Sequence, residues 1–165
     1  MLTGTTELAL RALIYLGLAA PAEPISPKRL ADTLNCSPTY LGKTLGLLVK
    51  ADILRSVRGA RGGVVLARDP RTISLLAVTE ACQGALIGDY CLSTAGRGLL
   101  APCRFHQVME DVHRQLVQTL SACSLADLLA CPAPKLTRNG DANACRMKLD
   151  GVEGSGAVNT RPRRA

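Results

Sequence analysis

The chain has 165 residues, enough for one compact domain with a buried core and an appendage. Hydrophobic residues make up 47% of it but aromatic residues only 2%, so the core must consist of Leu, Val, Ile and Ala, which suits packed helices better than a β-sandwich. No apolar run is long enough to cross a bilayer. Residues 8–20 are interrupted by Arg11 and lack a basic leader, so they do not resemble a signal peptide. We therefore expect a cytoplasmic protein without membrane contact.

The net charge of +7 is unevenly distributed along the chain. Residues 1–83 carry ten Lys and Arg against six Asp and Glu, residues 84–131 carry three against four, and residues 132–165 carry seven against three. A basic N-terminal module is suited to phosphate contact, although ordinary solubility charge is the alternative explanation.

Helical spacing of apolar residues predicts three helices in the first third of the chain, over residues 6–19, 28–34 and 39–51. Ser26-Pro27 supplies an N-cap followed by Pro at the first helical position, and Ser37-Pro38 repeats this signal. Asn35-Cys36 forms the turn between the second and third helices. Two short helices joined by a tight turn are typical of a helix-turn-helix.

A basic hairpin is predicted directly after the third helix. Two short β-rich runs, residues 53–57 and 63–67, flank a loop in which glycines permit positive φ and Arg58 and Arg61 face outward. A helix-turn-helix followed by such a hairpin is a winged helix. The alternative is a hairpin that only caps a helical core.

The remaining chain is predicted to contain a helix over residues 74–83, a loop over residues 84–101, a long helix that starts at Pro102, a short helix over residues 125–130 capped by Ser124, and a disordered tail. The long helix has one sustained apolar stripe, which on a small domain usually meets a second subunit. Its residues are Phe105, Val108, Met109, Val112, Leu116 and Leu120. The predicted fold is therefore mainly α, a winged helix-turn-helix domain with a two-stranded wing and a long dimerisation helix. We divide it into a DNA-binding domain (1–83), a cysteine-containing sensor loop (84–103), a dimerisation and closing segment (104–131) and a basic tail (132–165).

The second helix of a helix-turn-helix enters the major groove with its N-terminal residues toward the bases. This places the recognition helix near residues 37–49, with Ser37, Thr39, Tyr40 and Lys43 at the DNA. Tyr40 could alternatively pack its ring under the wing. From the wing, near residues 55–66, we expect Arg58 and Arg61 to reach the adjacent minor groove or its phosphates.

Three motifs in order along the chain resemble one family of regulators. They are residues 5–11 (TTELALR), residues 37–41 (SPTYL) and residues 57–63 (VRGARGG) followed by Leu66, and residues 124–129 (SLADLL) resemble its closing helix. The family is that of the iron–sulfur cluster regulator (IscR) and the nitrite-sensitive repressor (NsrR), which are dimeric winged-helix proteins. The resemblance covers about residues 1–131. It implies a homodimeric repressor that binds a pseudo-palindromic double-stranded DNA operator.

Cluster-binding members of that family carry three cysteines, each separated from the next by five residues, in some members followed by His after two residues. Cys91 and Cys103 match the outer positions and His106 matches the His, but Arg97 stands at the middle position, where a guanidinium cannot replace a thiolate. Some members use a carboxylate from the first helix of the partner subunit, and Glu7 matches it. The resemblance therefore implies an iron–sulfur cluster with mixed ligation, 2Fe–2S rather than 4Fe–4S, that responds to redox, nitric oxide or iron status.

Three alternatives stay open at this point. Cys91 and Cys103 could form a thiol switch without a cluster, the site could have lost any sensing role, or the winged helix could bind protein instead of DNA. An enzyme is not expected, because the chain has no Ser/His/Asp pattern, phosphate loop or paired carboxylates. Among the other cysteines Cys36 is predicted to be a small buried filler, and we assign no role to Cys82, Cys123, Cys131 and Cys145.

Overall fold

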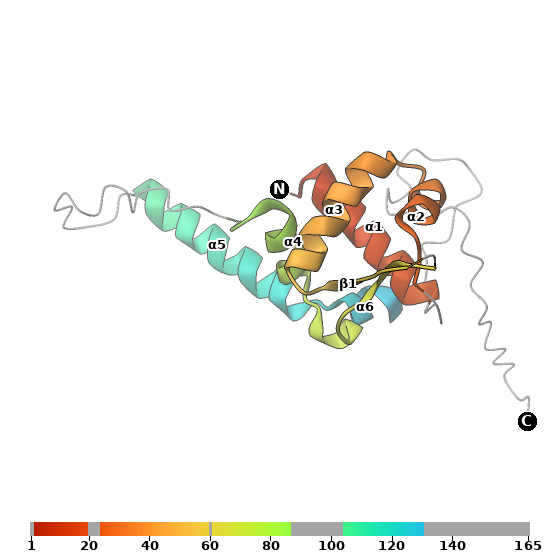
Figure 1. The fold of residues 1–165 in the computed structure, drawn as a ribbon. Coiled ribbons are helices and arrows are strands. Elements are labelled where there is room, and N and C mark those ends of the chain that lie inside the picture. The colour runs from red at the N-terminus through yellow and green to blue at the C-terminus, as the bar shows by residue number, and fades with distance from the viewer. Residues whose placement is uncertain (1, 20–23, 60, 87–103, 131–165) are drawn as a thin grey trace, which may run out of the picture.

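The computed structural model describes residues 2–19, 24–59, 61–86 and 104–130, and in these ranges it has six α-helices, one 3-10 helix and a two-stranded sheet (Figure 1). The elements are α1 (Gly4–Ala19), α2 (Pro27–Leu34), α3 (Pro38–Lys50), β1 (Leu54–Val57), β2 (Gly63–Leu66), η1 (Pro70–Thr72), α4 (Leu75–Gln83), α5 (Arg104–Ala122) and α6 (Leu125–Ala130). The predicted mainly α winged-helix fold is confirmed. None of the helices in the described ranges is long and apolar enough to cross a membrane. The predicted tail, most of the predicted loop and Pro102 lie outside the described residues.

Local capping sets the helix starts. Ser26 and Ser37 have extended backbones. The Ser26 side chain accepts a hydrogen bond from Arg29 N and the Ser37 side chain accepts one from Tyr40 N, as the sequence predicts for N-caps. Asn35 ends α2 in the left-handed region, with φ of 48°, which makes the tight turn before α3. α1 begins two residues earlier than predicted, because Thr3 Oγ1 accepts a hydrogen bond from Thr6 N at 3.3 Å and so caps the helix.

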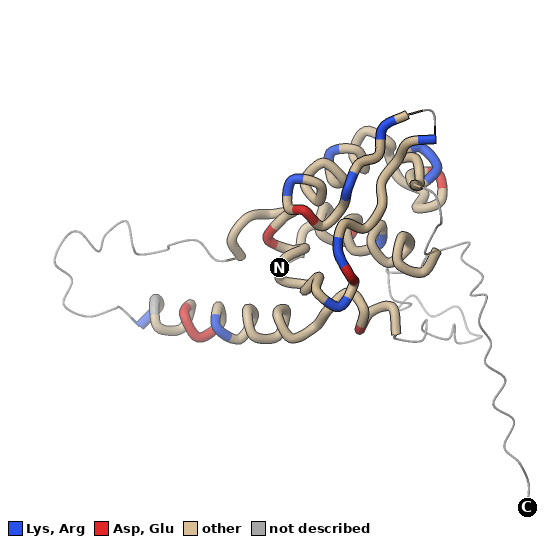
Figure 2. Tube along the Cα trace, turned by 60° about the horizontal axis from the view of Figure 1, so that its bottom comes forward, with Lys and Arg blue, Asp and Glu red and all other residues tan. Residues whose placement is uncertain are grey.

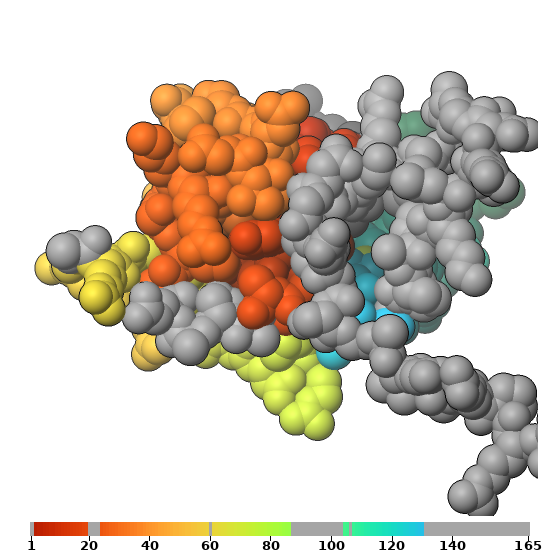
Figure 3. Space-filling model, turned by 90° about the vertical axis from the view of Figure 1, so that its right-hand side faces the viewer, coloured from red at the N-terminus to blue at the C-terminus, as the bar shows by residue number. Residues whose placement is uncertain are grey.

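The wing is an antiparallel hairpin of β1 and β2, with Leu54 opposite Leu66 and Val57 opposite Gly63. The segment before α2 also pairs with β2, through the single residue Ile25. Ile25 N donates to Val64 O at 3.2 Å, and Val64 N donates to Ile25 O at 2.9 Å. This pairing ties the base of the wing to the start of α2. Figure 3 shows the hairpin projecting at the edge of the molecule, beyond α2 and α3.

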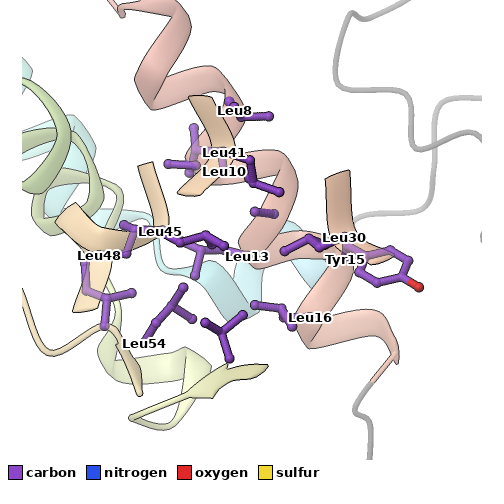
Figure 4. Close-up of a cluster of buried hydrophobic side chains, with 14 of the residues drawn as sticks. Leu8, Leu10, Leu13, Tyr15, Leu16, Leu30, Leu41, Leu45, Leu48 and Leu54 are labelled. Carbon is purple, nitrogen blue, oxygen red and sulfur yellow. The ribbon is translucent and has the colours of Figure 1, made fainter. Parts of the chain in front are cut away.

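The core consists of aliphatic side chains at the junction of α1, α2, α3 and the wing (Figure 4). The fully buried Leu13 of α1 lies between Leu30 of α2 and the leucines of α3, and Leu54 closes the cluster from β1. Tyr15 is the buried aromatic residue of this core, at the end near α2. The helices therefore pack through aliphatic side chains, as the composition of the sequence predicts.

The last two helices differ in their packing. α6 packs against α1 and η1 with Leu125 fully buried, and backbone hydrogen bonds hold its start, from Leu125 N to Ile73 O at 2.7 Å and from Leu75 N to Cys123 O at 2.9 Å. α5 contacts α4 but extends away from the rest of the domain (Figure 1). Its predicted apolar stripe is largely uncovered in the single chain, with Phe105 58% exposed.

Candidate nucleic-acid interface and metal ligands

One face of α3 is buried in the core and the opposite face is open. The buried residues are Leu41, Thr44, Leu45 and Leu48. Residues three or four apart lie on one side of a helix, and the exposed series on the far side is Thr39, Lys43, Gly46 and Lys50. A Cβ atom added at Gly46 would have no heavy atom within 4 Å. α3 therefore presents short and basic side chains on an unobstructed surface. Lys50 belongs to this surface, although it was not among the predicted DNA contacts.

Ser37 and Tyr40 lie at the N-terminal end of this face. Ser37 is exposed, and its Oγ accepts a hydrogen bond from Tyr40 N at 3.5 Å, so part of its hydrogen-bonding capacity is used in capping α3. Tyr40 is 42% exposed, and its hydroxyl lies 2.7 Å from Thr5 Oγ1 on α1. The ring thus lies against the start of α1, and the alternative that it packs under the wing is wrong for this structure.

Glycines determine the shape of the wing loop. Gly59 has a φ of 120°, which residues other than glycine rarely adopt. Gly62 N donates to Gly59 O at 2.9 Å and closes the turn. A Cβ at Gly62 would collide with the backbone carbonyl of Val57 and lie 2.8 Å from Gly59 O. Arg58 and Arg61 are both exposed on the two sides of this turn.

Positive charge gathers over the helix-turn-helix and the wing (Figure 2). Residues 24–66 contain seven Lys and Arg against two Asp and Glu, and all seven basic residues are exposed. They are Lys28, Arg29, Lys43, Lys50, Arg55, Arg58 and Arg61. Such a surface attracts a polyanion, and phosphate contacts release counterions on binding.

Arg11, which interrupts the apolar run of the first helix, holds the turn of the helix-turn-helix. Arg11 Nη2 on α1 donates to Leu34 O at the end of α2 at 2.9 Å. This bond satisfies a carbonyl that the end of α2 leaves without a helical partner. A charged residue within an apolar run could have indicated this contact, since a half-buried Arg needs hydrogen-bond acceptors.

The four predicted metal ligands are described only in part. Glu7 lies in the first turn of α1, where it is half-buried, and the backbone of His106 lies in the first turn of α5. Cys91 and Cys103, like Arg97 between them, lie outside the described residues. Within the ranges that the structure describes, no three His, Cys, Asp or Glu residues group as metal ligands would.

The other described cysteines are half-buried and free. Burial raises the pKa of the Cys36 thiol, although the positive charge of Arg11 opposes this, and burial also raises the pKa of the Cys82 thiol. Cys36 packs against the core but is only partly buried, so its predicted role as a buried filler stays a prediction. A thiol with a raised pKa is a poor nucleophile and a poor ligand at neutral pH.

Comparison with known proteins agrees with this geometry. The model of the Rrf2 family, described as an iron-dependent transcriptional regulator, matches residues 2–131. The HTH-type transcriptional regulator NsrR of Geobacillus kaustophilus (strain HTA426) is 32% identical over 130 residues, which cover 78% of this chain and 88% of the relative.

Two solved structures share the fold. T. potens IscR is 28% identical, with a TM-score of 0.59 over 78% of this chain and 85% of the other. CymR (YrzC), the global cysteine regulator of B. subtilis, has a TM-score of 0.63 over 78% of this chain and 95% of the other, but at 23% identity it supports the fold alone. The relatives are regulators and not enzymes, as the sequence predicts. The chain belongs to the Rrf2 family of winged-helix transcriptional regulators.

Proposed function

We propose that this regulator is a homodimeric repressor that reads operator DNA with the exposed face of α3 and with the wing, and that an iron–sulfur cluster sets its affinity for the operator. The observation that carries the DNA-reading part is the unobstructed basic face of α3 beside a wing whose arginines flank its tip. Thr39 and Lys43 then face the major groove, with Ser37 and Tyr40 at the N-terminal edge of the face. Arg58 and Arg61 approach the neighbouring minor groove or its phosphates.

Salt-dependent binding tests this interface. Short DNA duplexes with a randomised centre are selected on the wild-type protein, and the selected duplex is titrated at several salt concentrations. Arg58→Ala and Arg61→Ala should each weaken binding and lower the slope of log affinity against log salt by about one. Arg71→Ala is the control, since Arg71 is also exposed but lies in η1, paired with Asp69. Equal slopes for all variants would contradict the proposed wing contacts.

The dimer is proposed from the uncovered stripe of α5. Phe105, Val108 and Val112 are spaced by three and four residues, and each is more than 40% exposed in the single chain. A second copy of α5 would cover them. Val112→Glu should give monomers in light scattering, whereas Gln107→Glu, on the other side of α5, should not. A wild-type monomer would refute this part.

The proposed cluster ligands are Cys91, Cys103 and His106 of one subunit and the partner subunit's Glu7. The donor set fits iron, since two thiolates, an imidazole and a carboxylate are four acceptable ligands, and mixed ligation raises the reduction potential above that of an all-thiolate site. When bound, the cluster supplies one-electron redox chemistry and reactivity toward nitric oxide. The half-buried Glu7 lies on α1, the helix that also contacts α3.

Anaerobic purification with iron, sulfide and absorption measurements tests the cluster. We expect iron and labile sulfide in equal amounts, lost in Cys91→Ser, Cys103→Ser and Glu7→Ala. Arg97→Cys completes the three-cysteine pattern and should increase cluster content, while Arg114→Cys on α5 should not. A colourless wild-type protein would contradict the cluster and leave DNA reading intact. In that case a disulfide between Cys91 and Cys103, formed when a peroxide removes two electrons and two protons, becomes the explanation to test.

A further inference from the structure

A row of polar side chains joins the end of α4 to α3 through the first turn of α1. Thr3 N and Thr6 Oγ1 both donate to Gln83 Oε1, at 3.2 and 3.1 Å. Thr3 Oγ1 lies 3.1 Å from Thr6 Oγ1. On the other side of the same turn, Thr5 Oγ1 lies 2.7 Å from Tyr40 Oη. One helical turn therefore contacts both the last residue of α4 and the tyrosine at the edge of the DNA-reading face.

The hydrogen atoms of this row have a defined order on the Gln83 side. The Thr6 hydroxyl donates to Gln83 Oε1, so the Thr3 hydroxyl is left to donate to Thr6 Oγ1, while Thr3 Oγ1 accepts from Thr6 N. The Thr6 side chain is fully buried. A buried hydroxyl that loses its partner is costly, so α4 and α1 are held together at this point.

On the other side, the hydrogen bond to Thr5 restrains the direction of Tyr40. Tyr40 is substantially exposed, and its backbone is fixed by the capping bond to Ser37. Without Thr5 the ring of an exposed tyrosine is free to sample other rotamers. A ring already held in one rotamer loses less entropy when it meets DNA.

We infer that Thr5 and Gln83 are positioning residues for DNA recognition. Thr5 orients the Tyr40 hydroxyl, and Gln83 fixes the first turn of α1 to the end of α4. The position of that end therefore sets the position of Tyr40. The inference rests on the proposed DNA-reading role of α3. It gives a function to two polar residues that do not themselves lie on the exposed face of α3.

The Thr5 part is tested by a double-mutant cycle on the selected duplex. Thr5→Val should weaken binding by about twofold to tenfold, the worth of one hydrogen bond, and Thr5→Ser should restore it. In a Tyr40→Phe background, Thr5→Val should have no further effect. Thr79→Val is the matched control, because it removes a buried hydroxyl that donates only within α4, to Leu75 O at 2.7 Å, and it should leave affinity unchanged.

The Gln83 part uses Gln83→Leu, which keeps the size of the side chain and removes the acceptor. We expect its effect on affinity to be coupled to Tyr40→Phe, and this coupling to vanish when Thr5 is already Val. Thermal unfolding confirms that each variant is folded. If the wild type binds the duplex and both Thr5→Val and Gln83→Leu bind equally well, the inference is overturned and the row is only structural. If the wild type selects no duplex, the DNA-reading proposal fails, and this inference fails with it.

Discussion

Substitution of Gly63 by Ala tests whether the base of the wing is held by backbone contact. A Cβ at this position would fall on the carbonyl group of Ile25 and lie 2.9 Å from Ser26 N. These are backbone atoms that cannot rotate away, so the strand and the segment before α2 must separate. The two hydrogen bonds between Ile25 and Val64 are then strained or lost, at about 0.5–1.5 kcal/mol each.

Loosened packing adds to this loss, because Ile25 and Val64 are both nearly fully buried and overpacking a buried site costs about 1–3 kcal/mol. We therefore expect Gly63→Ala to lower the free energy of unfolding by roughly 2–6 kcal/mol. Denaturant unfolding followed by circular dichroism measures this free energy, at one fixed protein concentration because the proposed dimer would add a concentration-dependent contribution to stability. Gly46→Ala is the control, since its methyl meets nothing within 4 Å and replaces a helical glycine, which should add about 0.5–1 kcal/mol. Opposite signs are the expected result, and a wild-type stability for Gly63→Ala would refute the steric reasoning.

Three further outcomes follow from protonation and capping. Hydrogen bonds from Arg71 lower the pKa of Asp69 to about 2. The stabilisation from Asp69 is therefore complete above its ordinary pKa and disappears as the pH falls toward 2. In Asp69→Asn the free energy of unfolding should depend less on pH over that range. Ser124→Ala should lower the free energy of unfolding by about 1 kcal/mol, because α6 loses its cap. Hydrogen bonds from Ser124 hold the pKa of Asp127 below its usual value, so this pKa should rise in the variant, as measured by an NMR titration. Cys36 should react slowly with iodoacetamide at neutral pH, because burial raises its pKa, and quickly in urea, as followed by mass spectrometry of its peptide.

Local signals were enough to predict most of the fold. The two Ser-Pro pairs gave the starts of α2 and α3, because an N-cap and the following proline act within one helical turn. The pairing of Ile25 with Val64 was missed, since one bridging residue has no periodicity. The glycines of the wing were predicted to provide positive φ, yet only Gly59 does so, while Gly63 is required by contact with a distant segment, which spacing in the sequence cannot show.

In the candidate site, too, local spacing predicted some residues, whereas contacts between distant segments were missed. Thr39 and Lys43 were predictable, because helical spacing places them opposite the buried leucines of α3. The partner of Tyr40 was not, because Thr5 is brought to it only by the packing of α1 against α3. A threonine or glutamine whose role is one hydrogen bond to another helix leaves no pattern in a single sequence.

These contacts give α1 more than a core role. Within its first three turns Thr5 contacts α3, Glu7 is the predicted ligand offered to the partner subunit, and Arg11 holds the turn between α2 and α3. Because a helix of this length moves nearly as a rigid body, a displacement of Glu7 along the helix axis displaces Thr5 and Arg11 together. On the proposed ligand set, ligation by Glu7 would therefore act on both sides of the turn between α2 and α3 at once. Variants of Thr5 and Arg11 should then alter how strongly DNA affinity depends on cluster state, beyond their effect on affinity itself.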